Sequence, residues 1–415
     1  MKKIVSAVAL AAVAAGLATA EVKISANFRA RQNVLAHQFG HATTVFDQDG
    51  VDSESDSVSV KGSAEYGGFE FEVTAKNVDG SQNSSATFPK YNGWINFGDF
   101  MLKMGTWDSR AVGRVNADIG NHEGKYWGEL QKPGLAVSKW DGTNASLGND
   151  VSQQSNKYTT TMLAYTNKGL GLEVRGAYSN TKAAGYYNNN NDIDSAANVF
   201  MLEAGYTIKD IGRVLATTKA ADKDWVGALF FEPKLADLKA LTALAGVTYE
   251  RYVKAGTNAD GDDLTAQAIA GDFRVRYAIN DQLSVTGMFN WTGGDKVSSN
   301  KLVNQYAAWG MANVTYKLNE TFQPFFSVVY ASGSDGSTNN GVQLKMEAKA
   351  LAFDAPYAAS IRIYPGVSIF QTKNANIISG VALDISDVLH SSDYDTHGKL
   401  NNMTVTIPVL MRVKF

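Results

Sequence analysis

Hydrophobic and polar residues alternate along most of this chain, in short runs that are separated by turn residues. The clearest run spans residues 90–97, and a second follows at residues 100–105 after a two-residue turn. Because side chains of a strand point alternately to its two faces, these runs predict two strands that share one apolar side. The short turn predicts an antiparallel hairpin in which Phe97 and Phe100 lie on the same face.

The connections between the runs are of two kinds. Tight turns such as Gly67-Gly68 join some runs, whereas residues 106–156 show no convincing helix or strand pattern. A loop of about fifty residues without regular structure is expected to be functional or disordered. Tight turns that alternate with long loops, along a chain of alternating strands, are typical of a transmembrane antiparallel β-barrel of the outer-membrane type.

The alternation continues to the end of the chain and predicts an all-β fold. Residues 342–352 fit the helical and the strand period equally well, so we treat them as loop structure. Both ends of such a barrel lie on the periplasmic side, so the strand number must be even, and we predict about eighteen, with sixteen as the alternative. We expect strands at residues 22–31, 58–66, 69–76, 90–97, 100–105, 158–166, 170–178, 199–207, 213–220, 225–234, 239–253, 269–277, 283–291, 308–316, 322–330, 358–371, 375–387 and 401–415.

A soluble β-sandwich would turn its apolar face to a core and its polar face to bulk water. In this chain the polar positions carry charges in almost every run. With sixteen or more strands the lumen is too wide for side chains to fill, so we expect it to enclose water. Aromatic residues at the apolar positions near the ends of runs predict girdles at the membrane interfaces. These are Tyr66, Phe97, Tyr178, Tyr277, Trp291 and Tyr330.

The start of the chain has the pattern of an export signal. Two lysines are followed by small apolar residues 4–17 and by an A-x-A cleavage site that ends at Ala20. This pattern predicts a cleaved secretory signal peptide at residues 1–20, and the apolar run is too short for a retained membrane helix. We therefore predict export through the inner membrane, with residues 21–415 forming one barrel.

Composition excludes several classes of function. The formal net charge is −3, or −5 without the two lysines of the signal (36 basic against 41 acidic residues), which gives no support for a nucleic-acid partner. The chain has no cysteine, so disulfides and thiolate metal sites are excluded. His37 and His41 have the spacing of a helical metal pair, but no helix pattern surrounds them, and we expect no metal and no cofactor. No histidine lies on a predicted strand to activate a serine, so we do not expect an enzyme.

The last run, residues 404–415, alternates apolar and polar residues and ends in Phe415. It resembles the C-terminal strand of bacterial outer-membrane proteins, whose final aromatic residue is read by the barrel-assembly machinery. That resemblance makes Phe415 the candidate membrane-insertion signal and the machinery a partner. Pro408 departs from the pattern, and because it has no backbone N–H it predicts a bulge.

The run from Trp94 to Gly105 resembles the hairpin that precedes the third external loop of general bacterial porins. The resemblance implies that residues 106–156 fold into the barrel and narrow it, and it implies a homotrimer in outer-membrane lipid. The acidic Pro-Glu-Phe turn of enterobacterial constriction loops is absent, and the turn around Pro133 is the one proline-containing turn of the loop.

If residues 106–156 fold inward, their charges face the wall and set a transverse field that sorts solutes by size and charge. The alternative is a solvated surface loop. The candidate residues of the loop are Trp107, Asp108, Arg110, Arg114, Asp118, Glu123, Lys125 and Glu129. The candidate residues of the wall are Lys103, Arg29, Arg31, Lys61, Arg175, Arg274 and Arg276.

The sequence thus predicts an outer-membrane porin, a water-filled channel for passive diffusion of small hydrophilic solutes and ions. Two alternatives remain open. The barrel could display the polar loops at residues 35–56, 186–196 and 332–340 as a surface adhesin or antigen. It could also be a substrate-selective channel in which loop aromatics stack on sugars, although packing of the loop against the wall explains the same residues. The aromatics concerned are Trp107, Tyr126, Trp127 and Trp140.

Overall fold

The computed structural model of the protein describes residues 21–39, 43–47, 56–77, 84–107, 160–180, 198–221, 224–234, 238, 240–298, 301–334, 358–369, 374–385 and 403–415. The regular structure of these residues consists of β-strands. Among the residues described, none belongs to a helix that could cross a bilayer.

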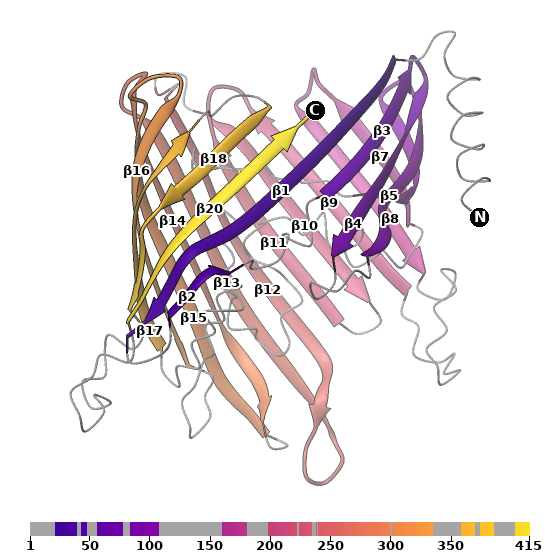
Figure 1. Ribbon diagram of the computed structural model, residues 1–415. Helices are drawn as coiled ribbons and strands as arrows, with labels where there is room; N and C mark the ends of the chain where they lie inside the picture. Colours follow the sequence, from indigo (N-terminus) through magenta and orange to yellow (C-terminus); the bar gives the residue numbers. More distant parts are fainter. Residues whose placement is uncertain are drawn as a thin grey trace.

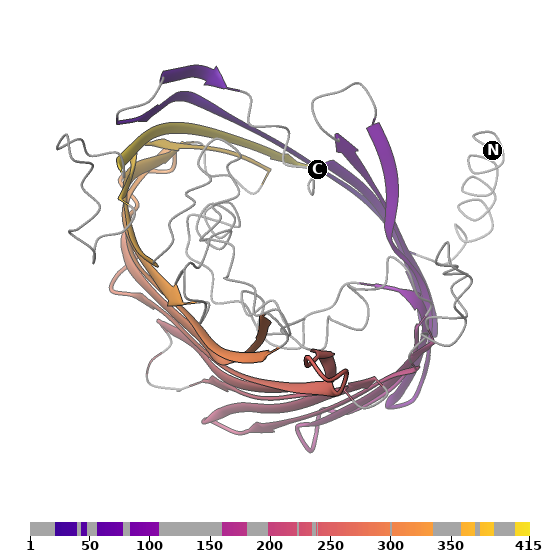
Figure 2. The same cartoon turned by 90° about the horizontal axis from the view of Figure 1, so that it is seen from below.

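The described strands form one antiparallel sheet that closes into a ring (Figure 1, Figure 2). From β3 to β17 each strand pairs with the next along the chain, and β1 pairs with both β3 and β20. Closure leaves no free sheet edge, so the backbone groups of each strand find partners on both sides. The strands are β1 (Glu21–Gln38), β2 (Thr43–Asp47), β3 (Asp56–Ala64), β4 (Gly67–Asn77), β5 (Ser84–Phe97), β6 (Phe100–Thr106), β7 (Thr160–Asn167), β8 (Leu172–Asn180), β9 (Asn198–Ile208), β10 (Gly212–Ala221), β11 (Asp224–Pro233), β12 (Leu241–Thr257), β13 (Asp263–Ala278), β14 (Leu283–Ser298), β15 (Lys301–Tyr316), β16 (Phe322–Ser334), β17 (Ala358–Ile369), β18 (Ala375–Gly380), β19 (Ala382–Ile385) and β20 (Met403–Lys414).

Each run that the alternation predicts contains a strand, but the predicted number of about eighteen, or sixteen, is wrong: the described residues form twenty. The two additional strands arise where a ladder is interrupted. β18 and β19 pair with β17 and with β20 in one unbroken register and are separated only at Val381. β2 pairs with the second half of β1, whereas β3 pairs with the first half. The predicted loop at residues 35–56 therefore contains the end of β1 and all of β2.

The bulge predicted at Pro408 is found beside it, on the neighbouring strand. Pro408 of β20 pairs with Asn33 of β1, and the register between the two strands shifts between Asn33 and Leu35. Because a proline offers no N–H to the ladder, the partner strand takes the extra residue at this point.

The β3–β4, β5–β6, β13–β14 and β15–β16 turns lie at one edge of the barrel, which we call the turn edge. Gly98 has a φ of 62°, a value that a two-residue hairpin turn requires at its first position. Asn280 and Asn319 each accept two backbone N–H groups through their side-chain oxygens, at 2.8 to 2.9 Å, and thereby close the β13–β14 and β15–β16 turns. Glu21 pairs with Ser63 beside the β3–β4 turn, and β20 ends at the same edge (Figure 1).

The outer face of the barrel is apolar, whereas the inner face carries the charged and polar side chains together with buried apolar ones such as Leu215 and Phe230. Large apolar side chains on the outer face are exposed, and the polar residues on the inner face are largely buried, as Glu203, Thr286, Asn313 and Ser327 are. This arrangement reverses that of a soluble β-protein and matches a barrel whose outer surface lies in lipid. The predicted girdle residues are all on the exposed outer side: Tyr66 68%, Phe97 49%, Tyr178 39%, Tyr277 44%, Trp291 37% and Tyr330 40%.

Candidate functional site

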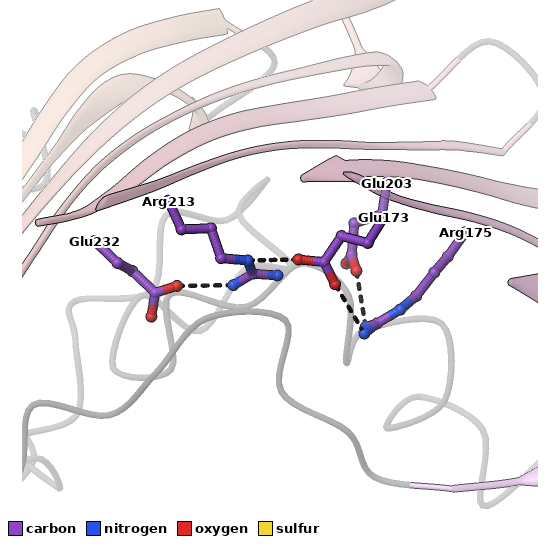
Figure 3. A network of polar contacts seen from close by, with 5 residues as sticks. All are labelled: Glu173, Arg175, Glu203, Arg213 and Glu232. Carbon is purple, nitrogen blue, oxygen red and sulfur yellow. Dashed lines mark hydrogen bonds and ion pairs between the residues drawn. The ribbon is translucent and has the colours of Figure 1, made fainter. Parts of the chain in front are cut away.

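A chain of five charged side chains crosses the inner wall from β8 to β11 (Figure 3). Glu173 and Arg175 lie on β8, Glu203 on β9, Arg213 on β10 and Glu232 on β11. The period of two along each strand places all five side chains on the inner face, because their neighbours in sequence point outward. We call this set the charged chain.

The ion pairs of the charged chain run in one sequence, with acid and base alternating. Glu203 accepts a hydrogen bond from Arg175 at 2.9 Å, and Arg175 also donates to Glu173 at 3.2 Å. Glu173 in turn accepts a hydrogen bond from Nε of Arg213 at 2.5 Å, and Arg213 donates to Glu232 at 2.7 Å. Each guanidinium therefore contacts two carboxylates, and Glu173 is shared by both arginines (Figure 3).

Glu173 and Arg213 meet although β9 lies between their strands. The space that Glu173 crosses on β9 lies at Gly205, which pairs with Glu173 in the register of β8 and β9. A Cβ atom on Gly205 would lie 2.6 Å from Oε1, 2.7 Å from Cγ and 2.9 Å from Cδ of Glu173. These distances are shorter than real Cβ contacts, so the absence of a side chain at Gly205 lets Glu173 lie flat across β9.

The members of the charged chain differ in their access to the lumen. The side chain of Glu203 is 1% exposed, whereas those of Arg175, Glu173, Arg213 and Glu232 are 18 to 28% exposed. A buried carboxylate is tolerated where it is paired and hydrogen-bonded, as Glu203 is with Arg175. Glu203 thus anchors the charged chain in the wall, and its other four side chains present their charges towards the lumen.

A second cluster on β3 to β6 combines lysines with indole rings. The ammonium group of Lys61 lies 5.5 Å from the ring centre of Trp94, and that of Lys103 lies 5.7 Å from Trp94 and 4.8 Å from Trp107. These separations allow cation–π attraction. The ring of Trp94 crosses β4 over Gly68, where an added Cβ would overlap the indole. This is the same use of a glycine gap as at Gly205.

Trp107, which the sequence offered either as a packing residue or as part of a sugar-binding track, is 3% exposed. It packs with Met162, Ala164 and Ala177 on the inner face of β7 and β8. The indole therefore fixes the end of β6, where the connection to β7 begins, against the wall.

The other predicted site residues are placed only in part. Arg175 belongs to the charged chain, Arg274 is 8% exposed on β13, and Arg276 is half-buried on the same strand. The backbones of Arg29 and Arg31 lie on β1, but their side chains are outside the described structure. The remaining loop candidates lie outside the described residues: Asp108, Arg110, Arg114, Asp118, Glu123, Lys125 and Glu129. The structure thus brings Lys61, Lys103 and Trp107 together, and it places Arg175 with acids of the wall.

Several charged residues of the wall were not predicted as site residues. The alternation placed Glu173 and Glu203 on polar faces, but nothing in the sequence indicated that either would meet Arg213. A further pair, Arg362 of β17 and Asp384 of β19, lies opposite in the register, with both side chains 4% exposed. Arg362 donates to both carboxylate oxygens of Asp384, and its Nη2 lies 2.9 Å from Oδ2. The one feature of the sequence that could have identified these residues is that each stands at a polar position of an alternating run.

No metal site is present in the part of the chain that the structure describes: no three histidine, aspartate or glutamate side chains gather there as ligands would. His37 lies on β1 and its Nδ1 is 2.7 Å from the hydroxyl of Thr43 on β2. The other histidine of the suggested pair, His41, lies outside the described residues.

No protein-family model and no curated protein matches the chain in sequence. Among solved structures, the chain is similar to the outer membrane channel DcaP of Acinetobacter baumannii, with 10% identity, 96% of this chain and 98% of that chain covered, and a TM-score of 0.46. It is also similar to an anion-selective porin from Comamonas acidovorans (9% identity, 95% and 100% covered, TM-score 0.48) and to OccK2 (OpdF) of Pseudomonas aeruginosa in complex with glucuronate (10%, 95% and 98%, 0.48). Scores and identities at this level describe a resemblance in architecture and carry no information on solute or selectivity.

Proposed function

We propose that this protein is an outer-membrane porin, a water-filled channel for passive diffusion of small hydrophilic solutes and ions. The observation that carries the proposal is the reversed surface: a closed ring with exposed apolar side chains outside and charged side chains inside. A barrel that served only to display loops would share the apolar outer face, but with this many strands the lumen is too wide for side chains to fill and is expected to hold water.

The proposal includes several expectations that come from the sequence alone. The chain is exported with cleavage of residues 1–20, and Phe415 is read by the barrel-assembly machinery. The connection at residues 106–156 narrows the lumen and sets selectivity together with charged residues of the wall. Assembly as a homotrimer in outer-membrane lipid is expected from the porin resemblance.

The test is single-channel conductance of the refolded mature chain in a planar lipid bilayer. Large, stable current steps are expected, and removal of residues 112–150 should increase the step size because it shortens the constricting loop. Removal of residues 186–196, another long loop, is the matched control and should leave the step size unchanged. A folded, membrane-inserted protein that passes no current would contradict the channel and favour the display barrel.

A substrate-selective channel is the second candidate, favoured by the half-buried indole ring of Trp94 on the inner wall, beside the ammonium groups of Lys61 and Lys103. It predicts block of the current that saturates as the solute concentration rises, whereas in a general pore a neutral solute lowers the current without saturation, because it only replaces electrolyte in the lumen. Titration of neutral sugars and of sugar acids into the same bilayer chamber distinguishes the two.

A further inference from the structure

We propose that the charged chain gives its side of the lumen a preference for small cations and cationic solutes, and that Gly205 is the positioning residue that holds Glu173 in it. The inference rests on the proposed function, because it names the class of ion that the channel favours. It concerns residues of the wall on β8 to β11.

The charged chain carries a net negative charge. The charged chain contains three carboxylates and two guanidinium groups, so its formal charge is −1 (two positive and three negative). Four neighbouring strands carry it, and three strand spacings correspond to a stripe about 14 Å wide. At 0.1 M salt the screening length is about 10 Å, so the charge of such a stripe acts on ions that pass along it.

Both arginines of the charged chain are already paired. Arg175 and Arg213 would attract anions if their guanidinium groups faced the lumen alone. Each of them instead donates to two carboxylates within 3.2 Å (Figure 3). An anion that approached either arginine would have to compete with a carboxylate already in place, and charge-assisted pairs of this kind are strong. The four members that face the lumen, two arginines and two glutamates, sum to zero, so the net charge of −1 is that of the buried Glu203, and it acts on a passing ion as a field from within the wall.

Gly205 leaves Glu173 its path to Arg213. Glu173 can neutralise both arginines only while its side chain crosses β9, and that path is open because Gly205 has no Cβ. A methyl group at this position displaces the carboxylate from Arg213 towards the lumen without changing the number of charges. Arg213 then keeps only Glu232 of its two carboxylates, and Glu173 keeps only its contact with Arg175, so more of the negative charge of Glu173 faces the lumen.

The experiment measures the reversal potential of the refolded channel in a tenfold KCl gradient, which gives the ratio of potassium to chloride permeability. Glu173→Gln and Glu232→Gln each remove one negative charge and should lower this ratio roughly twofold, the size expected for one unit charge acting through water over about 8 Å. Arg213→Gln should raise the ratio. All three changes should shrink when the salt is raised to 1 M, where the screening length falls to about 3 Å.

Gly205→Ala tests the positioning role separately, because it changes no charge. It should raise the cation preference, and the rise should disappear when it is combined with Glu173→Gln, since no charge is then left to displace. The matched control is Gly176→Ala on β8, where an added Cβ meets no atom within 4 Å. This control should leave the reversal potential unchanged.

The possible results separate the inference from the proposed function. If the unmodified protein conducts but Glu173→Gln and Glu232→Gln both leave its reversal potential unchanged, the charged chain does not select ions and the inference fails while the porin stands. If the Glu173→Gln variant does not insert into the bilayer, the reversal potential of the Glu232→Gln variant alone tests the inference, because Glu232 contacts a single arginine of the charged chain. If the unmodified protein passes no current, the proposed function fails first.

Discussion

Phe415 and Ala26 exchange two backbone hydrogen bonds, each 2.9 Å long, so the last residue of the chain is tied to β1. The side chain of Phe415 is 77% exposed on the outer surface. The backbone of this residue therefore helps to close the barrel, while its exposed phenyl group is available for recognition by another protein or for contact with lipid.

This division of roles predicts different outcomes for two changes at Phe415. Phe415→Ala keeps both hydrogen bonds, so the unfolding free energy of the refolded barrel should change by less than about 0.5 kcal/mol. Deletion of Phe415 removes both bonds and should cost about 1 kcal/mol for each. Urea unfolding in detergent micelles measures both values.

In cells, Phe415→Ala should lower the amount of protein in the outer membrane if the phenyl group is the assembly signal, and an unchanged amount would contradict that role.

The buried pair of Arg362 and Asp384 should be far more important to stability than an exposed pair. Asp384→Ala leaves a guanidinium group buried without its carboxylate and should lower the unfolding free energy by about 3–5 kcal/mol. Lys23→Ala, which breaks the exposed pair of Lys23 and Glu21 (side chains 72% and 66% exposed), should cost less than about 1 kcal/mol. The double change Arg362→Met with Asp384→Leu should recover most of the loss, because no charge is then buried. A double variant as unstable as Asp384→Ala would show that the unpaired buried charge is not the cause of the lost unfolding free energy.

The packing of Trp107 predicts a combined effect on stability and current. Trp107→Ala empties a site lined by Met162, Ala164 and Ala177 and should cost about 3–5 kcal/mol. Trp107→Phe retains most of the packing and should cost much less. If residues 106–156 narrow the lumen, Trp107→Ala should also enlarge the current steps, since it loosens the attachment of the loop. A variant of normal stability that only loses block by sugars would instead identify Trp107 as a stacking residue.

The apolar outer face predicts where a charge is tolerated. Phe273 on β13 is 49% exposed and lies between the predicted girdle residue Tyr277 and Ile269, so Phe273→Lys places an ammonium group in lipid. The expected cost is about 2–4 kcal/mol near the middle of the membrane. Leu318→Lys, in the β15–β16 turn where the side chain is 57% exposed, is the control and should cost about 1 kcal/mol or less. Equal costs at the two sites would mean that the outer face of β13 does not lie in lipid.

Local rules in the sequence were sufficient for much of the fold. A period of two decides which side chains share a face, so the alternation alone assigns Glu173 and Arg175 to the inner wall and Phe97 and Phe100 to the outer one. Turn residues such as Asn280 and Asn319 act on backbone groups two or three residues away, so their effect is visible in the sequence. The count of strands failed because an interruption such as Val381 depends on the strands to either side of it.

The contacts within the wall were decided by the tertiary structure. Alternation gives the face of a residue but not its register against neighbouring strands, and Glu173 and Arg213 meet only because β8, β9 and β10 are aligned to bring them together. The contact also needs Gly205 between them, a residue whose importance is its missing side chain. Sequence alone therefore determined which face of this protein is polar, whereas the register and the glycine gap decided which of its charges are paired.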